Sequence, residues 1–394
     1  MPKLYLDHLS KRYRRREWAL EDLDLEISGK EFVVVLGPSD SGKSTLLRLI
    51  AGIEKPTRGA VYLDDVPVGK KTPSTGKVAM VFRNHALYPR MTIRENIGYS
   101  LKLQHMSAET IGEKVAQAAE LFQITGILDQ KPVAVSVEQR RIVAIARAIV
   151  RDPQFVLLDE PFAGLDDGTR HRMRQLLQDI YQQMDATFLY VTHDPAEAMA
   201  LGTKIMILRD GRVQQMDTPQ EIYTHPASVF VAGLIGVPAM NFWKAKVSAD
   251  PRDGEEKQSD KMVSTMSAVF LQLEGLGKYS LSKEMATVLR NGGYVGREMI
   301  VGVRPEQIQL RQEGDLSAVS SFYGMDDAGG HLYLESQDKQ VTVRVERGQE
   351  PELGSVFFFD MEEADIHLFD GESEKRIVDD SQAEGDRPVL ANGQ

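Results

Sequence analysis

The chain has 394 residues, of which 42% are hydrophobic and none is cysteine, and its formal net charge is −11. This length predicts two globular domains, the lack of cysteine excludes disulfides and thiol catalysis, and the negative charge argues against nonspecific nucleic-acid binding. The apolar runs are only a handful of residues long, so we expect a cytoplasmic protein with no membrane-spanning segment and no signal peptide.

The N-terminal part predicts a strand, a glycine-rich loop and a helix in direct succession. Residues 3–8 and 19–27 read as strands, and the apolar residues 32–36 predict a short buried strand. The next stretch matches the phosphate-binding pattern of two glycines, separated by four residues and followed by Lys-Ser. It consists of Gly37, Pro38, Ser39, Asp40, Ser41, Gly42, Lys43, Ser44 and Thr45. Apolar positions beyond this loop recur at helical spacing.

The chemistry of this loop favours a bound triphosphate. Its backbone N–H groups and the dipole of the following helix attract phosphate. We predict that Lys43 reaches the β- and γ-phosphates and that the Ser44 hydroxyl binds Mg²⁺. The alternative is a glycine-rich turn without a ligand, and the flanking strand and helix argue against it. Tyr13, on a basic turn upstream, either stacks on an adenine ring or packs on the sheet edge.

The region between the loop and residue 150 predicts two short strands followed by helices. Residues 60–63 and 77–82 have the composition of strands. Residues 91–150 are mostly helical in pattern, with Pro132 as the main interruption.

Two further predicted strands end in side chains that can act on a phosphate. Residues 155–158 lead into Asp159 and Glu160, and residues 188–191 lead to His193. Ligands of open parallel sheets bind at the carboxyl ends of the strands, so we expect these side chains near the loop. Asp159 is predicted to hold magnesium, directly or through water, and Glu160 to orient or deprotonate an attacking water. His193 either holds that water or donates to the γ-phosphate. The alternatives are a strand-end cap and a satisfied polar histidine.

The C-terminal part predicts a second domain that is rich in strands. Residues 204–208 and 212–215 first form a hairpin through an Asp-Gly turn. Farther along, glycine turns separate short strand-like pieces, which indicates a small barrel or sandwich: residues 299–304, 331–334, 341–345 and 356–359. The charged residues 250–261 predict a flexible loop, and residues 378–394 predict a disordered tail.

Together these stretches resemble the ATP-binding subunit of an ABC transporter, and more narrowly its sugar-import branch, over residues 3 to about 377. The resemblance identifies residues 37–45 as the Walker A loop and residues 156–160 as Walker B with its catalytic glutamate. It makes Tyr13 the adenine-stacking aromatic and His193 the switch histidine, and residues 302–306 resemble a signature of the family's regulatory domain. The remaining nucleotide-binding residues that it implies are Arg83, Ser136, Gln139 and Asp166.

The resemblance implies an α/β fold with two domains. A P-loop NTPase domain of the ABC ATPase type is expected at residues 1–237, with a helical subdomain at about 91–150. A small β-barrel regulatory domain of the OB/MOP type is expected at residues 238–377. The implied reaction is ATP hydrolysis with Mg²⁺; the implied catalytic residues are Lys43, Glu160 and His193, and the implied metal ligands are Ser44 and Asp159. The implied partners are transmembrane permease subunits and a second ATPase subunit, at the inner face of the cell membrane.

Three departures from the family pattern bear on this prediction. Asp40 stands where glycine is usual and puts a negative charge into an anion-binding loop, which should weaken ATP binding. Arg83 replaces a glutamine expected to ligate magnesium, and a guanidinium contacts phosphate oxygens but cannot ligate a cation. Val137 and Glu138 replace two glycines of the signature that caps the ATP of a neighbouring subunit.

The signature change leads to a hypothesis about assembly. Ser136 and Gln139 remain, but the Glu138 carboxylate should repel a triphosphate by roughly a few kcal/mol in a partly dry interface. A homodimer carries two damaged sites, whereas a heterodimer with an intact homologue carries one nearly complete site. Two other functions stay open, a nucleotide-binding pseudo-ATPase with a regulatory role and a soluble ABC protein of repair or translation.

Overall fold

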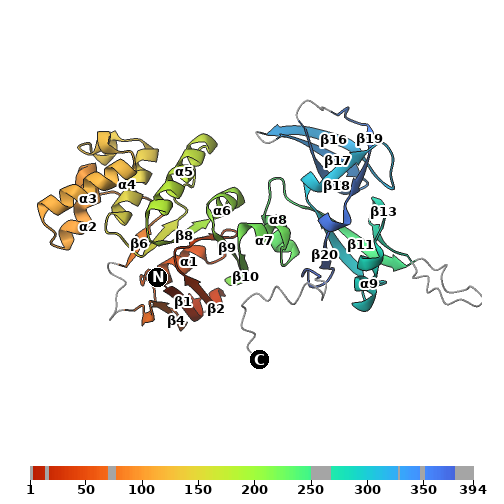
Figure 1. Cartoon of the computed structure of the whole chain (residues 1–394), viewed down its shortest axis with the longest axis horizontal. Coiled ribbons are helices and arrows are strands. Elements are labelled where there is room, and N and C mark those ends of the chain that lie inside the picture. Colours follow the sequence, from red (N-terminus) through yellow and green to blue (C-terminus); the bar gives the residue numbers. More distant parts are fainter. Residues whose placement is uncertain are drawn as a thin grey trace, which may run out of the picture. The chain divides into compact units, whose positions relative to one another are not determined.

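The computed structural model describes residues 3–13, 17–69, 77–249, 268–326, 329–346 and 351–377. The contacts within the chain divide it into two compact units, and the division falls between Ile222 and Tyr223 (Figure 1). The segment 223–237 groups with the second unit by these contacts, and the domain boundary at residue 237 stays a prediction. The predicted flexible loop at 250–261 and the predicted tail at 378–394 lie outside the described residues.

The first unit is built around a six-stranded sheet in the order β10-β9-β3-β8-β7-β6. Its members are β3 (Phe32–Leu36), β6 (Val78–Val81), β7 (Phe155–Asp159), β8 (Thr187–Thr192), β9 (Lys204–Arg209) and β10 (Arg212–Asp217). All neighbours pair in parallel except β10, which forms the predicted hairpin with β9. Strands β3, β7 and β8 are buried throughout, as expected for apolar strands covered on both faces. Their carboxyl ends therefore meet at one edge of the sheet.

An antiparallel sheet packs with helix α1 (Lys43–Ile50) on this central sheet. It has the order β2-β1-β4-β5, from β1 (Lys3–Arg12), β2 (Trp18–Ser28), β4 (Arg58–Leu63) and β5 (Val66–Pro67). Leu4 and Leu6 of β1 are fully buried and share one apolar core with Leu46 and Leu47 of α1. Each such leucine contributes about 2 kcal/mol through burial, so this core fixes the helix that follows the phosphate loop.

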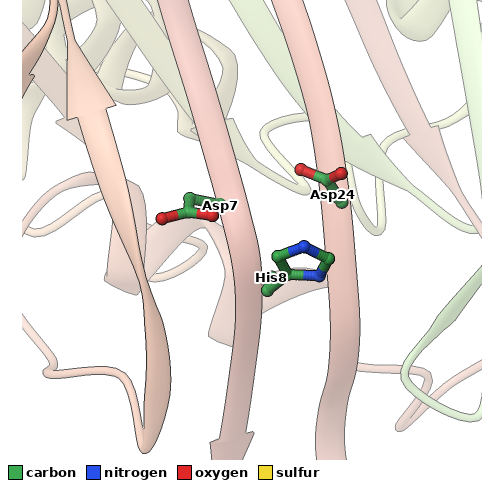
Figure 2. Close-up of side chains that lie close together, drawn as sticks. All are labelled: Asp7, His8 and Asp24. Carbon is green, nitrogen blue, oxygen red and sulfur yellow. The ribbon is translucent and has the colours of Figure 1, made fainter. Parts of the chain in front are cut away.

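A bulge in β1 brings three ionisable side chains together on the surface. The pairing of β1 with β2 shifts register between Leu6 and Leu9. Within this interval Asp7 and His8 lie close to Asp24 of β2 (Figure 2). Neighbouring carboxylates, with Asp22 first among them, raise the pKa of His8 and so favour its charged form.

The region predicted to be mostly helical forms three helices, which gather on one side of the first unit (Figure 1). They are α2 (Ile93–Leu103), α3 (Ala108–Leu121) and α4 (Val137–Ile149), with short 3-10 turns η1 (Thr125–Ile127) and η2 (Pro132–Ala134) before α4. Pro132 lies in the longer of the two breaks in this run, between α3 and α4, which confirms the prediction that it is the main interruption. Ser107 also breaks the helical run, because its side chain accepts from the Thr110 N–H and caps the start of α3. The first unit also contains α5 (Asp167–Gln183) and α6 (Pro195–Leu201), and α7 (Pro219–Thr224) runs across the boundary between the units.

The second unit contains two antiparallel five-stranded sheets, which confirms the prediction of a strand-rich second domain. The first has the order β13-β12-β11-β14-β20, from β11 (Asn241–Ala249), β12 (Val269–Leu273), β13 (Gly277–Ser280), β14 (Glu298–Val303) and β20 (His367–Asp370). The second has the order β15-β19-β16-β17-β18, from β15 (Ile308–Arg311), β16 (Leu316–Asp326), β17 (Gly329–Ser336), β18 (Lys339–Val345) and β19 (Val356–Met361). Trp243 and Phe359, one from each sheet, are buried in the shared core.

The helices among the described residues of the second unit are short. They are α8 (Val229–Leu234) and α9 (Lys283–Asn291), with 3-10 turns η4 (Pro305–Gln307) and η5 (Glu363–Asp365). The guanidinium of Arg304 is buried and donates to the carbonyls of Ile235 and Tyr223, so it ties the segment before β11 to the sheets. Among the helices of the described residues, none is long and apolar enough to cross a membrane.

Candidate nucleotide-binding site

The glycine-rich loop connects β3 to α1 and depends on its glycines for its shape. A Cβ atom at Gly37 would lie 2.1 Å from the carbonyl oxygen of Leu208. At Gly42, φ is +103° and a Cβ would lie 2.3 Å from the carbonyl oxygen of Ala19. Both positions therefore require glycine, and the loop folds closely over the start of α1 at Lys43. Asp40 has a φ of 63°, a left-handed conformation that glycine adopts more easily than aspartate.

The side chain of Lys43 is turned into the loop and buried there. Its ammonium donates to the carbonyl oxygens of Gly37, at 2.8 Å, and Pro38, and to the Ser41 hydroxyl at 3.4 Å. Burial lowers the pKa of Lys43, and the carboxylates of Glu160 and Asp159 oppose this shift. The cation therefore occupies the centre of the loop, where it can exchange carbonyl acceptors for phosphate oxygens.

Ser44 and Asp159 lie beside each other at the predicted metal site. The Ser44 hydroxyl donates to Oδ1 of Asp159 at 2.8 Å, although the two residues come from α1 and β7. Burial raises the pKa of Asp159, while the hydrogen bond from Ser44 lowers it. A hydroxyl and a carboxylate are hard oxygen donors of the kind that Mg²⁺ selects, so this pair fits the predicted ion.

Glu160 lies next along the chain and faces two positively charged or chargeable groups. Its Oε2 atom is 3.4 Å from Nη2 of Arg83 and 3.4 Å from Nδ1 of His193. The backbone of Glu160 has a φ of 45°, a strained conformation for this residue type. The Oε2 atom is buried and accepts no hydrogen bond within the described part of the chain. The side chain is thus held at the sheet edge with an acceptor available for a water molecule or another donor.

Arg83 lies on the stretch between β6 and α2, residues 82–92, which we call the Arg83 stretch. This stretch is anchored by residues that the sequence analysis missed. Asn96 of α2 is fully buried, and its carboxamide accepts from the Tyr88 N–H at 2.8 Å. It also donates to the carbonyls of Tyr88, at 3.1 Å, and Met91, at 3.3 Å. An asparagine flanked by the buried helix positions Ile93 and Ile97 was the available signal. Its hydrogen bonds fix the end of the Arg83 stretch on α2.

His85, on the same stretch, is a second residue that the sequence analysis missed. Burial and the charge of Arg141 lower the pKa of His85 to about 4, so its ring is neutral near pH 7. Arg141 of α4 in turn donates to the carbonyls of Pro161 and Ala163, just beyond Glu160. Hydrogen bonds of Arg141 therefore link α4 to the turn after Glu160, and the charge of the same guanidinium acts on His85.

The degenerate signature lies at the start of α4. Ser136 caps the helix, and its side chain and that of Gln139 form a reciprocal hydrogen-bonded capping box. The Glu138 carboxylate lies 3.5 Å from Nη2 of Arg172 on α5, whereas Val137 is 53% exposed. The negative charge that departs from the family pattern thus has a positive partner within the same unit.

Asp166 and Tyr13 complete the set of predicted site residues. Asp166 caps α5 by accepting from the Thr169 N–H at 2.9 Å, and this hydrogen bonding lowers its pKa. The Tyr13 hydroxyl donates to Glu54, and the Lys11 ammonium lies 5.0 Å from its ring centroid. The ring remains partly exposed. The structure thus brings together Lys43, Ser44, Asp159, Glu160, His193 and Arg83, while the nucleotide-binding roles of Tyr13, Ser136, Gln139 and Asp166 stay predictions.

Comparisons with known proteins agree with this geometry. Residues 20–163 match the family model described as ABC transporter, and residues 236–308 match the MalK OB fold domain. The oligosaccharides import ATP-binding protein MsmX of Bacillus subtilis is 36% identical over 386 residues, which are 96% of this chain and 100% of that protein. The sn-glycerol-3-phosphate import ATP-binding protein UgpC of Escherichia coli K12 is 36% identical over 382 residues, with coverage of 96% and 100%.

A solved structure matches about half of the chain. It is the dimeric post-hydrolysis state of the ATP-binding cassette MJ0796 bound to ADP and Pi. It is 31% identical in sequence with a TM-score of 0.50, and the match covers 55% of this chain and 98% of that one.

Proposed function

The chain belongs to the ABC transporter family of ATP-binding proteins, and from this premise we propose that it binds and hydrolyses ATP to power an importer of carbohydrates. The observation that carries the proposal is the convergence of Lys43, the Ser44–Asp159 pair and Glu160 at one sheet edge. The substrate class is supported by its relatives, whose names specify import of oligosaccharides and of sn-glycerol-3-phosphate.

We propose a separate role for each of the site residues. Lys43 exchanges the carbonyls of Gly37 and Pro38 for phosphate oxygens, and the loop N–H groups bind the remaining phosphate charge. Ser44 and Asp159 hold Mg²⁺, which when bound neutralises phosphate charge. These contacts orient the terminal phosphate toward the end of β7.

Glu160 and His193 act on the attacking water in this proposal. One oxygen of the Glu160 carboxylate is buried and accepts no hydrogen bond from the part of the chain that the structure describes, so it can orient the water and take its proton. His193 lies within 3.4 Å of that oxygen and is placed to hold the carboxylate or to stabilise charge on the phosphate. Removing either group should therefore reduce turnover more than it reduces binding of ATP.

We further propose a location and partners for the subunit. It associates with transmembrane permease subunits at the inner face of the cell membrane and pairs with a second ATPase subunit. Because Val137 and Glu138 stand in the signature, we favour a heterodimer in which the partner's intact signature completes the site built on this chain's Lys43 and Glu160. The solved cassette described as dimeric supports pairing as such.

ATPase assays of the chain alone and with a homologue that has an intact signature test this proposal. We expect little phosphate release from the chain alone and restored release from the mixture. Glu160→Gln in this chain should then remove most activity of the mixture, because the complete site uses this chain's carboxylate. Full turnover by the homodimer would contradict the heterodimer.

A pseudo-ATPase is the second candidate, favoured by the substitutions at Asp40, Arg83 and Glu138. In that case nucleotide binds to the complete assembly of ATPase and permease subunits, but no phosphate is released. Measurement of nucleotide binding beside phosphate release in the same assembly separates this candidate from the proposed ATPase.

A further inference from the structure

The two side chains that form the contact between Arg83 and Glu160 differ in their exposure to solvent. Arg83 follows β6, and β6 pairs in parallel with β7, the strand that delivers Glu160. The Arg83 side chain is 67% exposed, whereas that of Glu160 is 13% exposed. Their closest atoms are 3.4 Å apart, and Glu160 Oε2 accepts no hydrogen bond from the described residues. The guanidinium is therefore held by its attraction to the Glu160 carboxylate, and the exposed Arg83 side chain can change its position.

The position of this guanidinium is close to the expected terminal phosphate. Glu160 directly follows Asp159, which is hydrogen-bonded to Ser44 at the first turn after the phosphate loop. A phosphate group carries more negative charge than a carboxylate and offers several oxygens for bidentate contact with a guanidinium. The screened contact with one carboxylate is weak by comparison. A γ-phosphate is thus the stronger partner for Arg83.

We propose that Arg83 rests on Glu160 and moves to the γ-phosphate when ATP binds, so that an exchange of ion-pair partners distinguishes ATP from ADP. ADP has no γ-phosphate, and in its presence the guanidinium stays on Glu160. The exchange also removes one of the two groups that lie 3.4 Å from Glu160 Oε2, so this oxygen is more open to water only when ATP is present. This inference rests on the proposed function, since it assumes that the loop binds ATP.

The exchange differs from sensing through a metal ion in one measurable respect. A guanidinium carries its own charge and cannot ligate a cation. The contribution of Arg83 to the preference for ATP over ADP therefore persists when magnesium is removed with EDTA. A side chain that senses the γ-phosphate through magnesium loses its contribution under the same condition.

Nucleotide binding to the full chain tests the inference, with ATP and ADP titrated in EDTA and in magnesium. We expect Arg83→Gln to reduce the ratio of ADP to ATP dissociation constants about tenfold in EDTA, the size of one charge-assisted contact. In magnesium the reduction is smaller, because the introduced glutamine can ligate the ion that contacts the γ-phosphate. Arg94→Gln is the matched control, because Arg94 is an exposed arginine of α2 that pairs with Asp129 at 3.1 Å. It should leave the ratio unchanged.

A second variant asks whether the pair opens on binding. If ATP draws Arg83 away from Glu160, ATP binding has to break the resting pair. Glu160→Gln removes that pair and should therefore raise ATP affinity in the chain that has Arg83. The gain should be smaller in the Arg83→Gln background, which has no such pair to break. An equal gain in both backgrounds shows a static pair and overturns the inference. Failure of every variant to bind nucleotide contradicts the proposed function instead, whereas normal ATP binding with an unchanged ratio for Arg83→Gln in EDTA contradicts the exchange alone.

Discussion

Replacement of Asn96 by alanine should destabilise the first unit and loosen the stretch that carries Arg83. The Asn96 carboxamide is fully buried and accepts from the Tyr88 N–H at 2.8 Å. It donates to the Tyr88 carbonyl at 3.1 Å, to the Met91 carbonyl at 3.3 Å and to the Thr92 carbonyl at 2.9 Å. The unpaired N–H alone costs about 1–3 kcal/mol, and each lost carbonyl contact adds up to about 1 kcal/mol. We therefore expect the free energy of unfolding to fall by about 2–4 kcal/mol.

Urea denaturation of the full chain measures this loss, and hydrogen exchange at residues 83–92 measures the loosening. Ser100→Ala is the matched control on the same helix, because the Ser100 hydroxyl is buried without a hydrogen-bond partner among the described residues. Its removal should be neutral or stabilising. A loss below about 1 kcal/mol in Asn96→Ala, with unchanged exchange in the stretch, would mean that water replaces the carboxamide and that the anchoring role is wrong.

Two further substitutions test the loop and the second unit. Gly42→Ala should weaken ATP binding more than about tenfold in a binding titration, because φ is +103° and the added Cβ lies 2.3 Å from the Ala19 carbonyl oxygen. The control is Gly112→Ala, because a Cβ at Gly112 meets nothing within 4 Å. Burial, with the charge of Arg376, lowers the pKa of His367 to about 4, whereas the unfolded value is about 6.5. Unfolding therefore takes up a proton, and stability present above pH 6.5 is lost as the pH falls toward 4, by about 2 kcal/mol at pH 5. His367→Phe should reduce this slope in urea unfolding of the second unit, and an unchanged slope would contradict the assignment.

Much of the site is predictable from sequence because its signals are local. A run of apolar residues before Gly37 predicts a strand, the spacing of Gly42 and Lys43 predicts the loop, and strands that end in Asp159 and His193 predict their place at the sheet edge. The parallel sheet then brings these ends together whichever strands are neighbours. The role of each side-chain atom at that edge follows from the chemistry of its residue type.

The partners of Arg83 and Asn96 could not be predicted in the same way. The pairing of Arg83 with Glu160 depends on β6 lying beside β7, and strand order is a nonlocal property that residue spacing does not encode. The Asn96 contacts depend on how α2 packs on the preceding loop. The sequence predicts individual strands of the second unit, but their arrangement in two sheets depends on pairings such as that of Asn241 with Val303.

Two of the three charged departures from the family pattern, Arg83 and Glu138, share a physical feature that bears on how the site works. Arg83 lies 3.4 Å from Glu160, and Glu138 lies 3.5 Å from Arg172, each pair joining different elements of one unit. The partner reduces the field of the substituted charge, so the repulsion expected from Glu138 toward a triphosphate is smaller than that of an isolated carboxylate. Restoring glycine at position 138 alone would leave Arg172 without this partner and would change the charge of the interface by one unit. The effect of each departure therefore has to be measured on the pair, with Glu138→Gly compared against Glu138→Gly combined with Arg172→Gln.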